Sequence, residues 1–219
     1  GEFLIKKNDT LYSILKKIKN RDIYYRKLTI IEGFEIYQLK NLLNNSLLKI
    51  EDLDIYKYNL VADTFNYYKN QKLNKFFIEI DEYTKSIYKK NNLSKDLSHF
   101  SLKEIIIISS LVEKEAKTDN DKRLVSSVIF NRLKKNMKLD IDASVIFSIT
   151  EGNYKLDRKL KISDLKIDSP YNTYKNKGIP PKPICLPGSK TLEIVLEANK
   201  SSFYFYFYDE NKRSHIFSK

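Results

Sequence analysis

The residue of this sequence best suited to acid–base chemistry is Glu113, which follows a run of apolar residues. At roughly 100° per residue, a helix would place it in the middle of one broad face of apolar and small residues. The face consists of Leu102, Ile105, Ile106, Ser109, Val112 and Ala116. Such surroundings disfavour a charged carboxylate, so we expect a raised pKa that suits a general acid near neutral pH. The position would equally suit a glutamate that pairs with a basic neighbour at the rim of the core.

The stretch 101–117 predicts the helix that carries this glutamate. Ser101 and Glu104 have the spacing of a capping box, in which each side chain accepts a hydrogen bond from the backbone N–H of the other residue. The apolar run is too short to span a bilayer, so it indicates a buried helix of a folded domain. Glu115 points to another side of this helix, away from the apolar face described above.

Two further polar residues are candidates for a binding site. Asn131 falls on the inward face of a helix expected after Thr118, where its amide must hydrogen-bond either the backbone or a substrate. Of these two roles we favour the backbone. Asp142 precedes a short apolar run, and it could equally cap a short helix there.

A third group of candidates lies in the segment 169–188, which is rich in proline and glycine. Proline fixes the backbone and glycine permits sharp turns, so the segment predicts a rigid, shaped loop. Long ordered loops of this kind often carry function. The side chains of Tyr171, Asn172 and Tyr174 could stack on a sugar and hydrogen-bond it.

Composition excludes several function classes. The net charge is +12, but nearly all of the positive charge is lysine scattered along the chain, whereas recognition of phosphates and bases favours arginine. We therefore expect no nucleic-acid partner. Cys185 is the single cysteine, and His99 and His215 are the only histidines. A disulfide framework, a metal centre and a Ser-His-Asp triad are thus not expected, and we expect no cofactor.

The first part of the sequence, residues 1–72, predicts a small lobe and a connector. Strand patterns at 3–6 and 24–31 alternate with helical spacing at 11–18 and 36–43, and residues 51–72 look irregular. The tetrapeptide that begins at Asn8 resembles the Gly-Asp-Thr-Leu signature of LysM glycan-binding modules, with Asn in place of Gly.

Residues 73–219 predict a second domain with helices and a terminal hairpin. Helical spacing begins at Leu73 and again after Thr118, and a shorter helix is expected at 192–198. A strand at 202–208 has aromatic residues on both faces, which indicates burial on both sides or a rim that contacts ligand. The expected fold class is therefore α+β.

Several stretches keep the order and spacing of one known family, the endolytic murein transglycosylases (YceG-like), which this sequence resembles. They are Leu111–Ala116, Val128–Leu133, Met137–Asp142, Tyr171–Lys175, Gly178–Gly188, Tyr206–Tyr208 and His215–Phe217. They cover residues 101–219. The LysM-like start and Asn59–Phe65 fit the N-terminal region of the family, although the latter lacks a Gly and a Pro that the family usually has. Asp142-Ala-Ser also stands where the family usually has Asp-Pro-Thr.

The resemblance implies a lyase with a small LysM-like N-terminal lobe at 1–72 and an α+β catalytic domain at 73–219. Such an enzyme cuts β-1,4 bonds between N-acetylmuramic acid and N-acetylglucosamine inside nascent glycan strands, without water. Glu113 matches the catalytic glutamate. The residues that match the motifs of the cleft, and are expected to bind substrate, are Asn131, Asp142, Tyr171, Asn172 and Tyr174.

The resemblance also implies a location and partners. The family sits at the bacterial cytoplasmic membrane with its catalytic domain facing the periplasm or the cell exterior, and cell-wall synthases are candidate partners. The membrane anchor of the family is absent from this sequence, which starts at Gly1 without Met, so an anchor could have been removed. Two alternatives remain open: a non-catalytic peptidoglycan-binding protein, and a muramidase that adds water.

Overall fold

In the computed structural model, which describes residues 2–91, 97–197, 200–209 and 214–219, the central element is helix α4 (Leu102–Glu115). The predicted capping box is present: the Glu104 carboxylate accepts from the Ser101 N–H at 2.7 Å, and the Ser101 hydroxyl accepts from the Glu104 N–H at 3.3 Å. Residues 105–112 are all buried. The prediction of a capped helix in the core is therefore confirmed.

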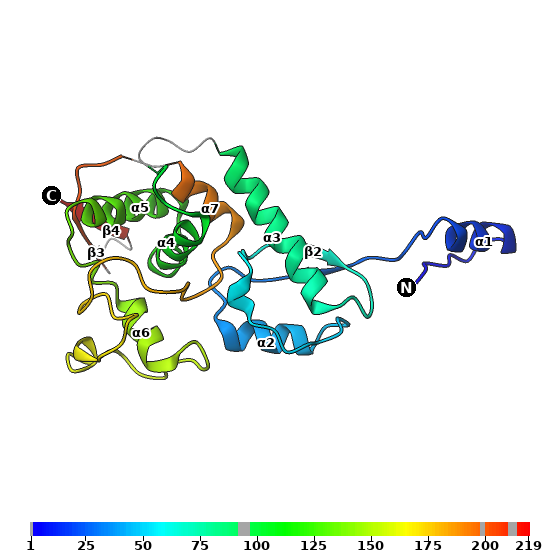
Figure 1. Ribbon diagram of the computed structural model, residues 1–219, viewed down its shortest axis with the longest axis horizontal. Helices are drawn as coiled ribbons and strands as arrows, with labels where there is room; N and C mark the ends of the chain where they lie inside the picture. The colour runs from blue at the N-terminus through cyan, green and yellow to red at the C-terminus, as the bar shows by residue number, and fades with distance from the viewer. Residues whose placement is uncertain (1, 92–96, 198–199, 210–213) are drawn as a thin grey trace.

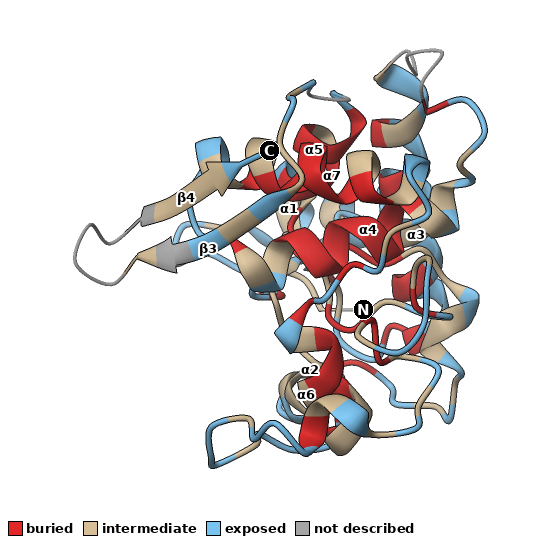
Figure 2. Cartoon of the chain, turned by 90° about the vertical axis from the view of Figure 1, so that its left-hand side faces the viewer, coloured by how far each residue is buried: buried red, intermediate tan, exposed pale blue. Residues whose placement is uncertain are grey.

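Three helices surround α4 and form a helical body with it. Helices α5 (Asp119–Lys134) and α7 (Ser189–Leu196) pack against α4 and against each other, and α6 (Asp142–Thr150) packs against α4 as well. In Figure 2 the buried residues gather where α4, α5 and α7 meet. The predicted helix after Thr118 is confirmed, and Thr118 caps it by accepting a hydrogen bond from the Asp121 N–H.

A smaller lobe is built from the N-terminal part of the chain. Strands β1 (Arg26–Thr29) and β2 (Thr64–Tyr67) pair antiparallel, and α2 (Ile36–Asn44) and the 3₁₀ helix η1 (Ile55–Lys57) lie between them in the sequence. The lobe has a hydrophobic core of its own. That core contains Leu28, Ile30, Leu39, Leu43, Leu48, Leu60, Ala62, Tyr67, Leu73, Phe76, Phe77 and Ile80.

Helix α3 (Leu73–Lys90) joins the two parts. Its first half, up to Ile80, belongs to the core of the lobe, whereas Ile87 belongs to the core of the helical body. The predicted helix from Leu73 is confirmed. The predicted domain boundary between residues 72 and 73 stays a prediction, because the helix that starts there contributes to both cores.

Several predictions for the N-terminal lobe are wrong in detail. No strand forms at 3–6, and the connector 51–72 is not irregular throughout, because β2 and η1 lie in it. Helix α1 (Leu11–Lys19) forms as predicted and is capped by Thr10. However, it contributes no buried residue and lies apart from the lobe at one end of the molecule (Figure 1).

The C-terminal hairpin forms as the sequence predicts. Strands β3 (Phe205–Asp209) and β4 (Ser214–Ser218) pair antiparallel, with Tyr206 opposite Phe217. The turn between them lies outside the described residues, as does most of the polar linker expected at 91–98. The mixture of helices and two small antiparallel sheets confirms the α+β class. In the part of the chain that the structure describes, no helix is long and apolar enough to cross a membrane.

Backbone hydrogen bonds join the lobe to the loop that leads into α7. The Gly33 N–H donates to the Leu186 carbonyl at 2.8 Å, and the Leu186 N–H donates to the Phe34 carbonyl at 2.8 Å. The Ala62 N–H donates to the Pro187 carbonyl at 2.7 Å. Because these bonds are made by main-chain atoms, they fix the lobe against the helical body independently of side-chain type.

We predict that the Ser101→Ala variant loses about 1 kcal/mol of unfolding free energy, because the Glu104 N–H loses its acceptor. The Ser101→Asp variant keeps an acceptor and a favourable charge at the helix N-terminus, so it should stay close to the wild type. Urea denaturation of the three proteins measures the difference. Equal midpoints for wild type and Ser101→Ala would show that the box does not stabilise α4.

Candidate active site

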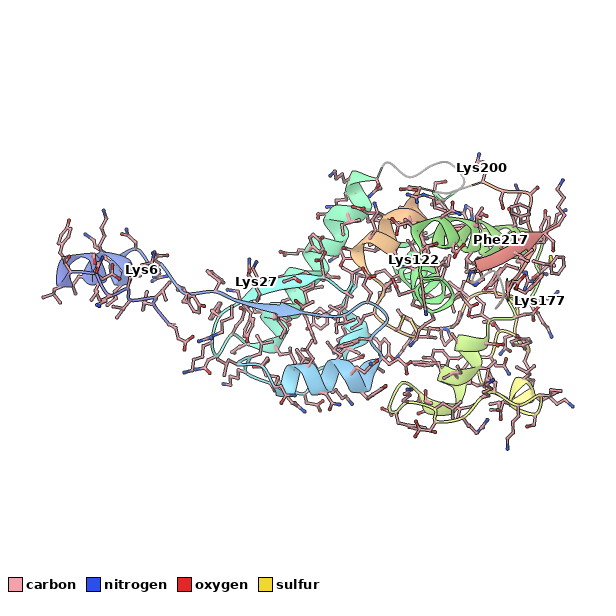
Figure 3. The ribbon with its side chains drawn as sticks, turned by 180° about the vertical axis from the view of Figure 1, so that it is seen from behind. Lys6, Lys27, Lys122, Lys177, Lys200 and Phe217 are labelled. Atoms are coloured by element: carbon pink, nitrogen blue, oxygen red, sulfur yellow. The ribbon has the colours of Figure 1, made fainter. Side chains whose placement is uncertain are left out.

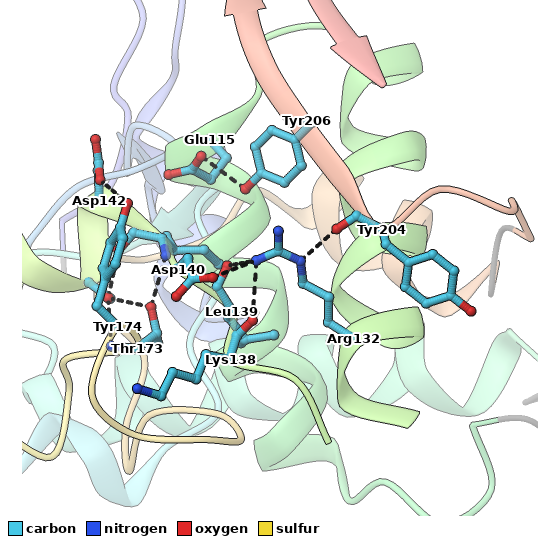
Figure 4. Close-up of polar contacts among 12 residues, drawn as sticks. Glu115, Arg132, Lys138, Leu139, Asp140, Asp142, Thr173, Tyr174, Tyr204 and Tyr206 are labelled. Atoms are coloured by element: carbon cyan, nitrogen blue, oxygen red, sulfur yellow. Dashed lines mark hydrogen bonds and ion pairs between the residues drawn. The ribbon is translucent and has the colours of Figure 1, made fainter. Parts of the chain in front are cut away.

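The last turn of α4 carries a glutamate in an unusual setting, and it is Glu115. The Tyr206 hydroxyl donates to its Oε2 atom at 3.0 Å (Figure 4). Burial raises the pKa of Glu115 above its ordinary value, and the nearby Asp142 carboxylate raises it further. The Tyr206 hydrogen bond, His215 and the Ala143 backbone N–H act in the opposite direction. Desolvation is the largest effect, so the protonated form is favoured.

Asp142 faces the same region as Glu115 and is held by a tyrosine. The Tyr174 hydroxyl donates to the Asp142 Oδ1 atom at 2.6 Å (Figure 4). Burial raises the pKa of Tyr174, and the Asp142 carboxylate adds to the rise, so the hydroxyl stays a donor. Asp142 is the first residue of α6, where the partial positive charge of the helix N-terminus favours a carboxylate. Asp142 is thus the first residue of a short helix and not its cap, because Ile141 holds the N-cap position, and its role in substrate binding stays a prediction.

Arg132 of α5 holds the chain segments on either side of these groups. Its Nε donates to the Tyr204 carbonyl at 2.6 Å, just before β3, and its Nη1 donates to the Leu139 carbonyl at 2.8 Å, just before α6. A further contact of 3.2 Å joins Nη1 to the Asp140 carboxylate. A single buried guanidinium therefore fixes the start of both elements that face Glu115.

These groups form an arrangement that can transfer protons to and from a ligand. Burial raises the pKa of one carboxyl group, Glu115, whereas Asp142 lies at a helix N-terminus and accepts a hydrogen bond. Two carboxyl groups in unlike environments are the pattern of an acid beside a charge-stabilising carboxylate. The pair can donate a proton to a leaving group and stabilise positive charge on the atom left behind.

The structure places Glu113 in a buried ion pair within the core, and the catalytic role that the sequence predicts for it stays a prediction. Its Oε1 atom accepts from the Lys122 Nζ at 2.9 Å, and its Oε2 atom accepts from the Gly188 N–H at 2.9 Å and from the Thr191 hydroxyl. The Glu113 and Lys122 side chains are only 7% and 5% exposed. Figure 3 shows Lys122 inside the helical body, unlike Lys6, which lies at the far N-terminal end. The pairing of this glutamate with a basic neighbour, which the sequence left open, is therefore observed.

Two asparagines predicted to bind substrate are engaged by the protein itself. The Asn131 amide donates to the Ser201 carbonyl at 3.0 Å and to the Phe203 carbonyl at 2.9 Å, so both of its N–H bonds hold the approach to β3. Asn172 is fully buried, and its amide donates to the Leu165 and Ile167 carbonyls. The amide donors of both residues are therefore used within the protein, and their predicted role in substrate binding stays a prediction.

The two predicted tyrosines of the loop at 169–188 lie at two different places along α6. Tyr174 lies in the Glu115 region, as described above. The Tyr171 ring packs on the Phe147 ring of α6, with their centroids 4.7 Å apart, and it borders a cavity between α6 and the lobe. The structure thus brings Asp142 and Tyr174 together with Glu115, and it places Tyr171 further along α6.

Two features of the sequence pointed to Glu115 and Tyr206, which were not among the predicted site residues. Glu115 stood two positions from the favoured glutamate, and Tyr206 lay in the aromatic strand that predicted either burial or a rim. Arg132 gave no signal beyond its place in a family motif. Among the described residues, no group of three histidine, cysteine, aspartate or glutamate side chains is arranged to hold a metal ion.

Comparisons with known proteins agree on one family. The profile of the YceG-like family matches residues 1–219. An endolytic murein transglycosylase of Bacillus subtilis (strain 168) is 39% identical over 135 residues, which are 62% of this chain and 34% of the relative. A protein of the same name from Streptococcus pneumoniae (strain R6) is 33% identical over 125 residues, which are 57% of this chain and 22% of the relative.

A solved structure supports the same grouping. The crystal structure of a YceG-like protein of Listeria monocytogenes superposes with a TM-score of 0.72 at 26% identity, and the match covers 94% of this chain and 78% of that one. The match to the curated relatives above spans about a third or less of their length.

We predict that Lys122→Met is strongly destabilising, by roughly 3–5 kcal/mol, because it leaves the Glu113 carboxylate buried without a cation. The double variant Glu113→Gln/Lys122→Met should recover much of the loss. Lys190→Met, which removes an exposed pair with Glu193, should cost less than about 1 kcal/mol. Thermal and urea denaturation measure all three. If the double variant is as unstable as Lys122→Met, the cost lies in packing and not in charge.

We also predict a stability difference that depends on pH between Glu115→Gln and the wild type. Burial raises the folded-state pKa of Glu115 above 4.5. The folded state of the wild type therefore binds the carboxyl proton more tightly than the unfolded state does. Its stability therefore falls as pH rises from about 4.5 through the folded-state pKa, and glutamine removes this loss. The advantage of the variant should be smallest in acid and grow towards neutral pH in urea titrations. A constant difference at every pH would contradict the raised pKa.

Proposed function

The chain belongs to the YceG-like family, and from this premise we propose that it is an endolytic murein transglycosylase, as the curated relatives are named. Its substrate is the glycan strand of nascent peptidoglycan, and its reaction cuts the β-1,4 bond between N-acetylmuramic acid and N-acetylglucosamine. The observation that carries the proposal is the Glu115 carboxyl group, whose pKa is raised by burial and which accepts a hydrogen bond from Tyr206 near Asp142.

The proposed mechanism assigns the acid and base roles to Glu115 and not to Glu113. Glu115 protonates the bridging oxygen, and the bond to the anomeric carbon of the muramoyl unit breaks. The resulting carboxylate then accepts the proton of the C6 hydroxyl of that unit, whose oxygen attacks the anomeric carbon. The product ends in a 1,6-anhydro ring, no water is consumed, and Glu115 regains its proton.

The other groups have supporting roles in this mechanism. Asp142 stabilises the positive charge that develops on the sugar ring, because a carboxylate near an oxocarbenium ion lowers its energy. Tyr174 holds Asp142, and Tyr206 holds the Glu115 carboxyl group in one orientation. Glu113 neutralises Lys122 in the core and takes no part in the chemistry.

The finer features implied by the family belong to the same proposal. A LysM-like character of the N-terminal part rests on the tetrapeptide at Asn8 alone, which leads into α1 and lies apart from the lobe of β1 and β2. A location at the bacterial cytoplasmic membrane, with the catalytic part facing outwards, and cell-wall synthases as partners rest on the family resemblance alone.

We predict that Glu115→Gln lowers turnover of purified glycan strands by a factor of about a hundred or more, because a positioned acid–base group is lost. Glu113→Gln should keep most of the activity at a temperature where it is folded. Mass spectrometry of the wild-type products should find 1,6-anhydro ends, one water lighter than the products of a hydrolase.

Three outcomes would change the proposal. Normal turnover by Glu115→Gln, with loss in Glu113→Gln, would return the catalytic role to Glu113. Reducing ends from the wild type would identify a muramidase, in which Asp142 is placed to activate water. Tight glycan binding by a wild-type protein that releases no product would identify a non-catalytic peptidoglycan-binding protein.

A further inference from the structure

A cavity of about 450 Å³ lies between α6 and the N-terminal lobe, at a distance along α6 from the Glu115 carboxyl group. Its volume is in the range of ligand-binding pockets, which is roughly 300–1,000 Å³. We call it the inter-lobe trough. Its walls are formed by Lys40, Asp54, Tyr56, Phe147, Glu151 and Tyr171, with several smaller polar residues.

Two tyrosines from opposite sides of the inter-lobe trough line it. Tyr56 comes from η1 of the lobe, and Tyr171 comes from the proline-rich loop of the helical body. Burial raises the pKa of Tyr56, and Tyr171 and Asp54 contribute to the rise. Both residues therefore lie near the Tyr56 hydroxyl group. The Lys182 Nζ lies 4.3 Å from the centroid of the Tyr56 ring, so a cation holds this ring from a neighbouring loop.

The floor of the inter-lobe trough is held by the turn that ends α6. Glu151 and Gly152 both have positive φ, 50° and 69°, so the chain turns sharply after Thr150. A Cβ atom at Gly152 would lie 2.9 Å from the Phe147 ring, which shows how closely this turn backs the aromatic floor. The Tyr37 N–H donates to the Gly152 carbonyl at 3.0 Å and ties the turn to the lobe.

Helix α6 leads from the region of the acid to the inter-lobe trough, because Ala143 at its start contacts Glu115 and Phe147 near its end lines the trough. A neighbouring cavity of about 310 Å³ shares Phe147 as a lining residue and is also lined by Ala143 and Ile146 of α6. The Ala143 backbone N–H hydrogen-bonds Glu115. A polymer that places one bond at Glu115 can therefore follow α6 and place a later part of itself between Tyr56 and Tyr171.

The chemistry of the lining fits a sugar unit. Aromatic rings offer flat apolar faces to the C–H bonds of a pyranose, and side chains with oxygen or amide groups can bind its hydroxyl and acetamido groups. The polar groups available are Asp54, Ser148, Glu151, Asn153 and Ser169. Mixed charges, with Lys40 beside two carboxylates, favour a neutral polar ligand over a strongly charged one.

We propose that the inter-lobe trough is a second saccharide-binding site, which holds a sugar unit of the same glycan strand away from the bond being cut. The proposal rests on the proposed function for the identity of the polymer. Its consequence is a preference for long strands: a chain that reaches from Glu115 to Tyr56 gains contacts that a short oligosaccharide cannot make.

The test uses glycan chains of graded length, freed of peptides, and the Glu115→Gln protein, which binds without cutting. Calorimetry compares it with the same protein carrying Tyr56→Ala. The expected result is about a tenfold loss of affinity for long chains and no change for a disaccharide, since one stacked ring of this kind is worth about that factor. Tyr12→Ala removes a tyrosine that is 77% exposed on α1 and should change neither affinity.

A Tyr56→Phe variant keeps the ring and loses the hydroxyl group, so it should retain most of the affinity for long chains. Thermal melts confirm that each variant is folded at the assay temperature. Unchanged long-chain affinity in Tyr56→Ala, or binding only when peptides are attached, would overturn the second site and leave the proposed function standing. Failure of the folded parent protein to bind any glycan would overturn both.

Discussion

The fold depends on how the last turn of α4 accommodates two glutamates in a desolvated environment. A buried carboxylate is costly unless a cation neutralises it or a proton does. Glu113 takes the first solution, with Lys122 and the N-terminus of α7 around it. Glu115 is shifted towards the second, because burial and the Asp142 carboxylate raise its pKa more than Tyr206, His215 and the Ala143 N–H lower it. One helix thus carries a structural ion pair and a proton-holding group two residues apart.

The sequence predicts the helices better than the site, because helices depend on neighbouring residues and the site depends on contacts between distant ones. Helix periodicity and capping residues are local, so α1, α3, α4 and α5 are predicted with near-correct bounds. Strand β2 is missed because it has four residues and a partner, β1, that is distant in sequence. The strand pattern at 3–6 has no pairing strand among the described residues and forms no strand. Pairing in a sheet is settled by tertiary contacts that periodicity does not contain.

Periodicity also predicts which face of a helix a residue lies on, but not which partner that residue contacts. Periodicity places Glu113 on the side of α4 that turns inwards, and that is where it lies. It contains no information about which helix supplies Lys122, and therefore none about the charge state. For Asn131 and Asn172, burial requires hydrogen bonds but leaves the partner open, and in both the partner is a backbone carbonyl. The motif Tyr171–Lys175 combines the buried Asn172 with Tyr171, which lines a cavity, and Tyr174, which donates a hydrogen bond to Asp142.

The loop at 169–188 links the two parts of the molecule to one another and to the site. Its beginning supplies Tyr171 and Tyr174, and its end forms main-chain bonds with Gly33, Phe34 and Ala62 of the lobe. Proline restricts the backbone between these ends, so the loop is a restrained connection between the lobe and the region of Glu115. The position of the lobe is therefore part of the geometry around Glu115. A fragment that began at residue 73 would keep the acid but lose the wall that contains Tyr56.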